Sequence, residues 1–159
     1  MSLDKGIANK ILTIGCECNP PRGGIAQVLY NYQMFVYPTF KFVANSGDGG
    51  KVAKVWQLIK AVFDVVAMLR KDGGIQIVHI HTSSYTGFNR SKIFIKIAKA
   101  FGKKVVLHIH GGSFREFYQT SPASISKTLD ACDCIIALSE SWKAFFCKVT
   151  KTKVCIVDN

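Results

Sequence analysis

Residues 103–114 read KKVVLHIHGGSF and combine a buried strand with a polar, glycine-containing turn. The β-branched run predicts a strand that ends at His110, and two glycines follow at once. An earlier stretch, residues 75–84 (IQIVHIHTSS), has the same design and ends its strand at His81. All four histidines of the chain lie in these two stretches. Because the unperturbed pKa of histidine lies near neutral pH, two matched strands that end in histidine indicate a site.

Strand and helix patterns alternate on both sides of these stretches, without a β-hairpin signal. This alternation predicts an α/β fold, a Rossmann-like three-layer α/β/α domain with a mostly parallel six-stranded sheet in the order 2-1-3-4-5-6. At 159 residues the chain fits a single domain, residues 1–159. We expect strands at residues 10–16, 39–44, 75–81, 104–110, 133–138 and 153–157, and helices at 24–36, 51–71, 90–101, 114–119, 123–131 and 140–148.

The helix expected at residues 51–71 has the clearest periodicity. Its apolar residues recur at three- and four-residue steps, which predicts one buried stripe, while the lysines and Asp64 lie largely off it. The stripe expected to be buried consists of Val52, Val55, Trp56, Ile59, Val62, Phe63 and Val66.

Composition and charge narrow the class of protein. The hydrophobic content of 48% predicts a globular chain, and no apolar run approaches the ~20 residues that a membrane span needs. The polar N-terminus carries no secretory signal. A net charge of +11 favours an anionic partner such as phosphate, nucleic acid or an acidic membrane, although a solvated surface also explains it. The six cysteines lack metal-finger spacing and are expected as reduced, mostly buried thiols of a cytoplasmic protein.

Candidate site residues follow from the expected topology, because open parallel sheets bind ligands beyond the carboxyl ends of their strands. The glycine pair 23–24 opens a helix, where free N–H groups suit a phosphate or a sugar hydroxyl, although a simple turn is the stronger interpretation of the pair alone. His110 is the preferred functional histidine, and His81 stays open between a site and a core role. His79 and His108 are expected in the core. The loops at this edge carry Arg22-Gly23-Gly24, His81-Thr82-Ser83-Ser84 and His110-Gly111-Gly112-Ser113.

A basic stripe follows from the spacing of four lysines in and after the helix expected at residues 90–101. Such a face either lies on an anionic membrane surface or is an ordinary solvated surface, and the sequence leaves both open. The stripe consists of Lys92, Lys96, Lys99 and Lys103.

The order of motifs along the chain resembles one enzyme family. The motifs are PPRGGIAQVLYNY, IVHIHTSS, VVLHIHGGSF, DACDCIIALSESWKAFF and KVCIVDN. Together they resemble the N-terminal, acceptor-side domain of family-4, retaining glycosyltransferases with the GT-B fold. This chain has Gln76 where the family usually has Asp. The resemblance implies the N-terminal half of a two-domain enzyme, whose nucleotide-sugar-binding C-terminal domain is missing here.

The resemblance also implies roles for individual residues. His110 would be the catalytic residue, facing the transferred sugar, and Gly23, Gly24 and Gly111 would lie against the donor phosphate or sugar. The acceptor side would be lined by Arg22, His81, Ser83, Ser84, Ser139 and Glu140.

The reaction that the resemblance implies moves a sugar from a nucleotide sugar to a saccharide or lipid-linked acceptor, with retention and without a metal or other cofactor. Positioning and stabilisation of the leaving diphosphate would supply most of the catalysis. The basic charge then fits an acceptor at the inner membrane face, as in capsule or other surface polysaccharide biosynthesis. We expect the chain alone to lack transferase activity.

Two other functions remain open. The histidines of the two H-x-H strands form a candidate zinc-ligand set for a metal-dependent hydrolase, although no acidic residue lies near either pair. A non-catalytic nucleotide- or nucleic-acid-binding module fits the charge, although the aromatic and basic residues that interleave on such surfaces are missing. We therefore expect no nucleic-acid partner.

Overall fold

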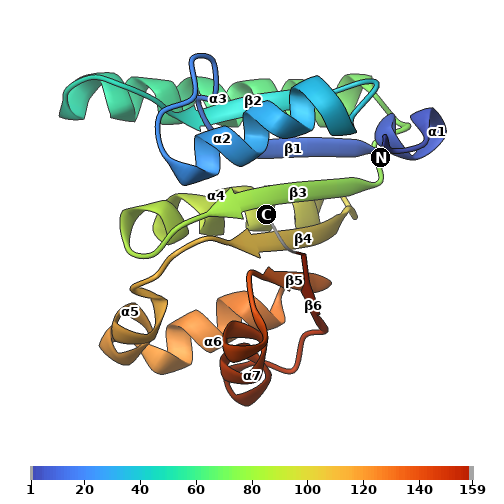
Figure 1. The fold of residues 1–159 in the computed structure, drawn as a ribbon. Helices are drawn as coiled ribbons and strands as arrows, with labels where there is room; N and C mark the ends of the chain where they lie inside the picture. The colour runs from blue at the N-terminus through green and yellow to red at the C-terminus, as the bar shows by residue number, and fades with distance from the viewer. Residues whose placement is uncertain (1, 158–159) are drawn as a thin grey trace. The chain divides into compact units, whose positions relative to one another are not determined.

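A computed structural model describes residues 2–157 of the chain (Figure 1). The chain divides into two compact units, an N-terminal unit of residues 1–79 and a C-terminal unit of residues 80–159. The division falls within the third strand, β3 (Ile77–Thr82). None of the helices in the described part is long and apolar enough to cross a membrane.

The N-terminal unit pairs two parallel strands and covers them with helices. Its elements are α1 (Lys5–Ala8), β1 (Ile11–Cys16), α2 (Gly24–Asn31), the π-helix η1 (Tyr32–Val36), β2 (Lys41–Ser46) and α3 (Lys51–Lys71). Leu12, Thr13 and Ile14 follow one another in β1 and are all fully buried. Because successive side chains of a strand point to opposite faces, both faces of β1 are covered. Helix α2 packs on β1, and α3 packs on β2.

The C-terminal unit continues from β3 and packs around aromatic rings. Its further elements are α4 (Thr86–Ala100), β4 (Lys104–Ile109), α5 (Phe114–Thr120), α6 (Pro122–Asp130), β5 (Cys134–Ala137), α7 (Glu140–Val149) and β6 (Val154–Ile156). The fully buried Phe114 contacts Phe88 and Phe146 edge-on, with ring centroids 5.4 Å and 5.2 Å away. These contacts join α4, α5 and α7.

The six strands form one sheet in the order β2-β1-β3-β4-β5-β6. The pairs β1–β2, β4–β5 and β5–β6 are parallel, with Leu12 opposite Lys41 and Ile135 opposite Val154. The parallel pairing confirms the α/β class that the alternating pattern predicted, and the strand order confirms the predicted order 2-1-3-4-5-6.

The buried face of α3 is not the face that the periodicity predicted. Ala61, Val65 and Leu69 are buried where α3 packs on β2. Of the stripe expected to be buried, Val62 and Val66 are half-buried and the other five residues are exposed. One reason is the length of the helix, which spans about 31 Å with its 21 residues, whereas the six-residue β2 spans about 20 Å. Part of α3 therefore extends beyond the strand on which it packs. The other is that α3 is apolar on two opposite faces, so spacing alone cannot choose between them.

Smaller corrections concern the ends of elements. Helix α4 begins at Thr86, four residues before the helix start that was predicted at residue 90. Strand β2 starts two residues later than predicted, at Lys41, and extends to Ser46. The cap at Ser139 is confirmed, because its hydroxyl accepts a hydrogen bond from the Trp142 backbone N–H at 3.3 Å. The last two residues of the KVCIVDN motif lie outside the described residues.

The cysteines form no disulfide within the described chain. Cys18 and Cys132 are buried, Cys147 is exposed, and the other three are half-buried. The expectation of mostly buried thiols therefore holds for only two of the six.

Candidate functional site

Three imidazole rings of the C-terminal unit pack together, and we refer to His81, His108 and His110 as the imidazole cluster. The Nδ1 of His81 lies 3.0 Å from the Nε2 of His110, at hydrogen-bond distance. The ring centroids of His108 and His110 are 4.1 Å apart, and those of His81 and His108 are 4.8 Å apart. The His110 backbone N–H also donates to the Thr82 carbonyl at 2.8 Å. The ends of β3 and β4 thus bring the two predicted site histidines together.

Burial divides the imidazole cluster into an inner and an outer part. His108 is fully buried and His81 is 3% exposed, whereas His110 is half-buried. Burial lowers the pKa of His110 from 6.5 to about 4, because a charged ring would lose its hydration there. His110 is therefore neutral at pH 7. A neutral imidazole offers one donor and one acceptor nitrogen, which suits a sugar hydroxyl but gives a diphosphate no positive charge.

The turn after β4 lies directly against the loop after β3. A Cβ added to Gly111 would overlap the hydroxyl of Ser84 and would lie 3.0 Å from the Ser84 backbone nitrogen. Gly87, at the start of α4, approaches the hydroxyl of Ser83 in the same way. A side chain at position 111 would therefore have to displace Ser84. This contact places Ser84 beside the turn that carries His110.

Tyr85 is a residue of this region that the sequence did not single out. Its φ of 53° lies in the left-handed region, which is unusual for a residue other than glycine. The side chain is 48% exposed, and its ring lies 5.0 Å from that of Phe117. Strained backbone of this kind gathers at functional sites. A positive φ at a tyrosine leaves no signal in a single sequence.

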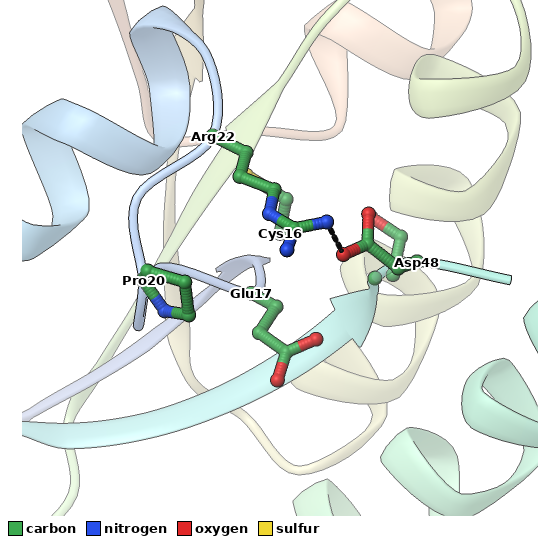
Figure 2. A pocket seen from close by; sticks show the side chains of 7 residues that line it. Cys16, Glu17, Pro20, Arg22 and Asp48 are labelled. Atoms are coloured by element: carbon green, nitrogen blue, oxygen red, sulfur yellow. Dashed lines mark hydrogen bonds and ion pairs between the residues drawn. The ribbon is translucent and has the colours of Figure 1, made fainter.

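The N-terminal unit has a separate pocket at the carboxyl ends of β1 and β2 (Figure 2). The cavity measures about 200 Å³. Arg22 points toward Asp48 and forms an ion pair with it, and Glu17 adds a second carboxylate to the lining of the pocket (Figure 2). The pocket is lined by Cys16, Glu17, Pro20, Arg22, Ser46, Gly47 and Asp48.

Close contacts hold the segments around this pocket together. The Glu17 backbone N–H donates to the Ser46 carbonyl at 2.7 Å, which ties the two loops together. A Cβ added to Gly47 would overlap the Glu17 carboxylate and lie 2.9 Å from Nε2 of Gln57. Of the lining residues only Arg22 was predicted as a site residue. Glu17 and Asp48 were missed, although each follows the end of a predicted strand.

The glycine pair of the first loop opens α2 as predicted. Gly23 is the N-cap residue and has a φ of 94°, which favours glycine. Among the described residues, no heavy atom lies within 4 Å of a Cβ added to Gly23 or Gly24. The positions that side chains would occupy at Gly23 and Gly24 are therefore uncrowded, at the start of the eight-residue helix α2.

A family model described as Glycosyltransferase Family 4 matches residues 23–159. The chain belongs to Glycosyltransferase Family 4. The match begins at Gly23 and contains both histidine turns. Searches of curated proteins and of solved structures gave no match. Membership confirms the resemblance found in the motifs and makes this a glycosyltransferase-family domain.

Two other predicted residues of this Family 4 domain lie at the start of α7. The Ser139 hydroxyl is used to cap the helix. Glu140 is exposed in the first turn. Nearby, Arg115 was not predicted: its Nη2 donates to the Ser141 hydroxyl at 2.8 Å, and its guanidinium lies 5.2 Å from the Trp142 ring.

The basic stripe of α4 is partly engaged in contacts within the C-terminal unit. The Nζ of Lys92 lies 5.5 Å from the Phe88 ring and 3.5 Å from the Ser124 hydroxyl. Lys99 forms an ion pair with Asp133 at 3.0 Å. These contacts favour a structural role for two of the four lysines.

Proposed function

We propose that this chain is the acceptor-binding domain of a retaining glycosyltransferase. The enzyme would move a hexosyl group from a nucleotide sugar to a hydroxyl of a saccharide, carried on a lipid, in capsule or other surface polysaccharide biosynthesis. The observation that carries the proposal is the turn at His110 and Gly111, packed against the HTSS loop in a domain matched by the Family 4 model. A second domain would bind the nucleotide sugar.

His110 acts in this proposal as a neutral hydrogen-bonding group. Its pKa of about 4 keeps the ring uncharged at cytoplasmic pH. The hydrogen bond between the His81 and His110 rings limits how the His110 ring can rotate. His110 therefore orients a hydroxyl of the transferred sugar. The charge on the leaving diphosphate must be stabilised by other groups, and the second domain together with the N–H groups at the start of α2 are the candidates.

The pocket beside β1 and β2 supports a saccharide as acceptor. It contains two carboxylates, Glu17 and Asp48, and one guanidinium, Arg22. Two carboxylates and one guanidinium have a net negative charge, which repels a diphosphate. Paired carboxylate and guanidinium groups hydrogen-bond well to sugar hydroxyls. We assign the acceptor saccharide to this pocket and the reacting end of the donor sugar to the turn at His110.

A binding experiment on the chain itself tests the proposal. The ¹⁵N-labelled protein is titrated with short oligosaccharides and, separately, with nucleotide sugars, and backbone amide shifts are followed. Saccharides are expected to shift Glu17, Arg22 and Asp48. Asp48→Asn should weaken binding at least tenfold, whereas Asp64→Asn on α3 should not. Shifts at these three residues with nucleotide sugars alone would overturn the assignment.

A metal-dependent hydrolase remains the second candidate, because the imidazole cluster gathers three histidine side chains, which are common zinc ligands. Their ring centroids lie at most 5.1 Å from one another. Elemental analysis of the purified chain separates the two functions. Stoichiometric zinc that is lost in His108→Ala would favour the hydrolase.

A further inference from the structure

The outer face of α3 carries a row of exposed apolar side chains, which we call the α3 stripe. Each member lies three or four residues from at least one other member, so all of them share one side of the helix. Trp56 is 69% exposed and Phe63 is 70% exposed. The α3 stripe consists of Val52, Val55, Trp56, Ile59 and Phe63.

Packing within the N-terminal unit does not account for the α3 stripe. The helix attaches to β2 through its opposite side, where Ala61, Val65 and Leu69 are buried. The helix is thus apolar on both sides. A single exposed apolar residue is ordinary, but a contiguous row that contains Trp and Phe marks an interaction surface.

The polar residues of α3 are strongly basic. The helix contains Lys51, Lys54, Lys60, Arg70 and Lys71, and its one acidic residue, Asp64, is paired with Lys60 at 2.7 Å. An outward apolar row with Trp and Phe, bordered by lysines, is typical of helices that lie in the interface of an anionic bilayer. Basic residues near such a surface are attracted to its anionic lipids.

We propose that α3 docks the protein onto an anionic lipid bilayer, with the helix in the plane of the interface and the α3 stripe facing the acyl chains. Charge decides between this surface and a second copy of the chain. A symmetric dimer through the stripe would pair two helices that each carry five cations and one acidic residue, so their net positive charges would repel each other. The proposal concerns attachment alone and holds whatever reaction the enzyme catalyses.

The test compares vesicles of phosphatidylcholine with vesicles that also contain one quarter phosphatidylglycerol, in a flotation assay. We expect binding to the anionic vesicles only. W56Q/F63Q should reduce the partition coefficient at least tenfold. Phe35→Gln is the matched control, because Phe35 on η1 is also 70% exposed and lies outside the stripe. All variants should keep the far-ultraviolet spectrum of the wild type.

Tryptophan fluorescence measures how deeply the α3 stripe enters the bilayer. Trp142→Phe leaves Trp56 as the sole tryptophan. Its emission should shift to shorter wavelength on anionic vesicles and should be quenched by lipids brominated near the headgroup. Binding that survives W56Q/F63Q but is lost in K92E/K96E would assign attachment to α4 and overturn the proposal. A dimer abolished by W56Q/F63Q, without vesicle binding, would also overturn it, in favour of a second copy.

Discussion

Gly111 and Ser84 are in such close contact that a side chain at position 111 would have to displace Ser84. The two residues follow the ends of β4 and β3. These strands carry His108 and His81, and His110 comes directly after β4. The contact therefore fixes the backbone that presents His110 relative to the HTSS loop. Both stability and binding should respond to small changes at this point.

Gly111→Ala should destabilise the protein, because the new methyl group overlaps the Ser84 hydroxyl and crowds its backbone nitrogen. The expected loss is about 1–3 kcal/mol in the free energy of unfolding, measured by urea titration. Gly112→Ala is the control, since no heavy atom of the described chain lies within 4 Å of a Cβ added there. Equal effects of the two substitutions would contradict the packing argument.

Stability should rise with pH between about 4 and 6.5 through His110. The unfolded chain takes up a proton on this ring near pH 6.5, whereas the folded protein does so only near pH 4. Between these two pH values the unfolded state binds more protons than the folded state. The free energy of unfolding is therefore unaffected by this ring above pH 6.5 and falls as the pH drops toward 4. His110→Gln should lose less stability than the wild type between pH 7.5 and 4.5. Parallel melting-temperature profiles would refute the lowered pKa.

The ion pair between Arg22 and Asp48 should contribute little to stability. Both side chains are about 70% exposed, at 69% and 71%, so water screens their attraction. A double-mutant cycle with Arg22→Ala and Asp48→Ala should give a coupling energy of about 0–1 kcal/mol in chemical unfolding. The same two variants are expected to weaken saccharide binding. Strong coupling in stability would assign the pair a structural role.

Ser139→Ala should lower the free energy of unfolding by about 1 kcal/mol, because it removes the hydroxyl that accepts the Trp142 N–H at the start of α7. The matched control is Ser113→Ala at the start of α5, whose side chain makes no capping bond within residues 2–157. Its effect should stay within about 0.5 kcal/mol. Thermal unfolding of the two variants, followed by circular dichroism, compares them directly.

The sequence predicted those features that depend on alternation and on strong helix ends. The bounds of α3, from Lys51 to Lys71, match the prediction because glycines precede the helix and Asp72-Gly73-Gly74 follows it. The parallel α/β class followed from the alternating strands and helices, and the predicted strand order is confirmed. The contact between His81 and His110 followed from two strands that end alike.

Other features depend on tertiary contacts that a single sequence does not encode locally. Both sides of α3 are apolar, so only the packing on β2 reveals that Ala61, Val65 and Leu69 face inward. The left-handed backbone of Tyr85 carries no residue signature. The pocket of Glu17, Arg22 and Asp48 depends on the register of β1 and β2, which places two distant loops together.

The two sides of α3 share no side chain, so the helix can be altered on one side at a time. Polar residues introduced at all five positions of the α3 stripe would leave Ala61, Val65 and Leu69 in place. Such a variant should keep its melting temperature while gaining solubility at high concentration. The surface that we assign to lipid binding can therefore change in composition while the interior of the domain stays the same.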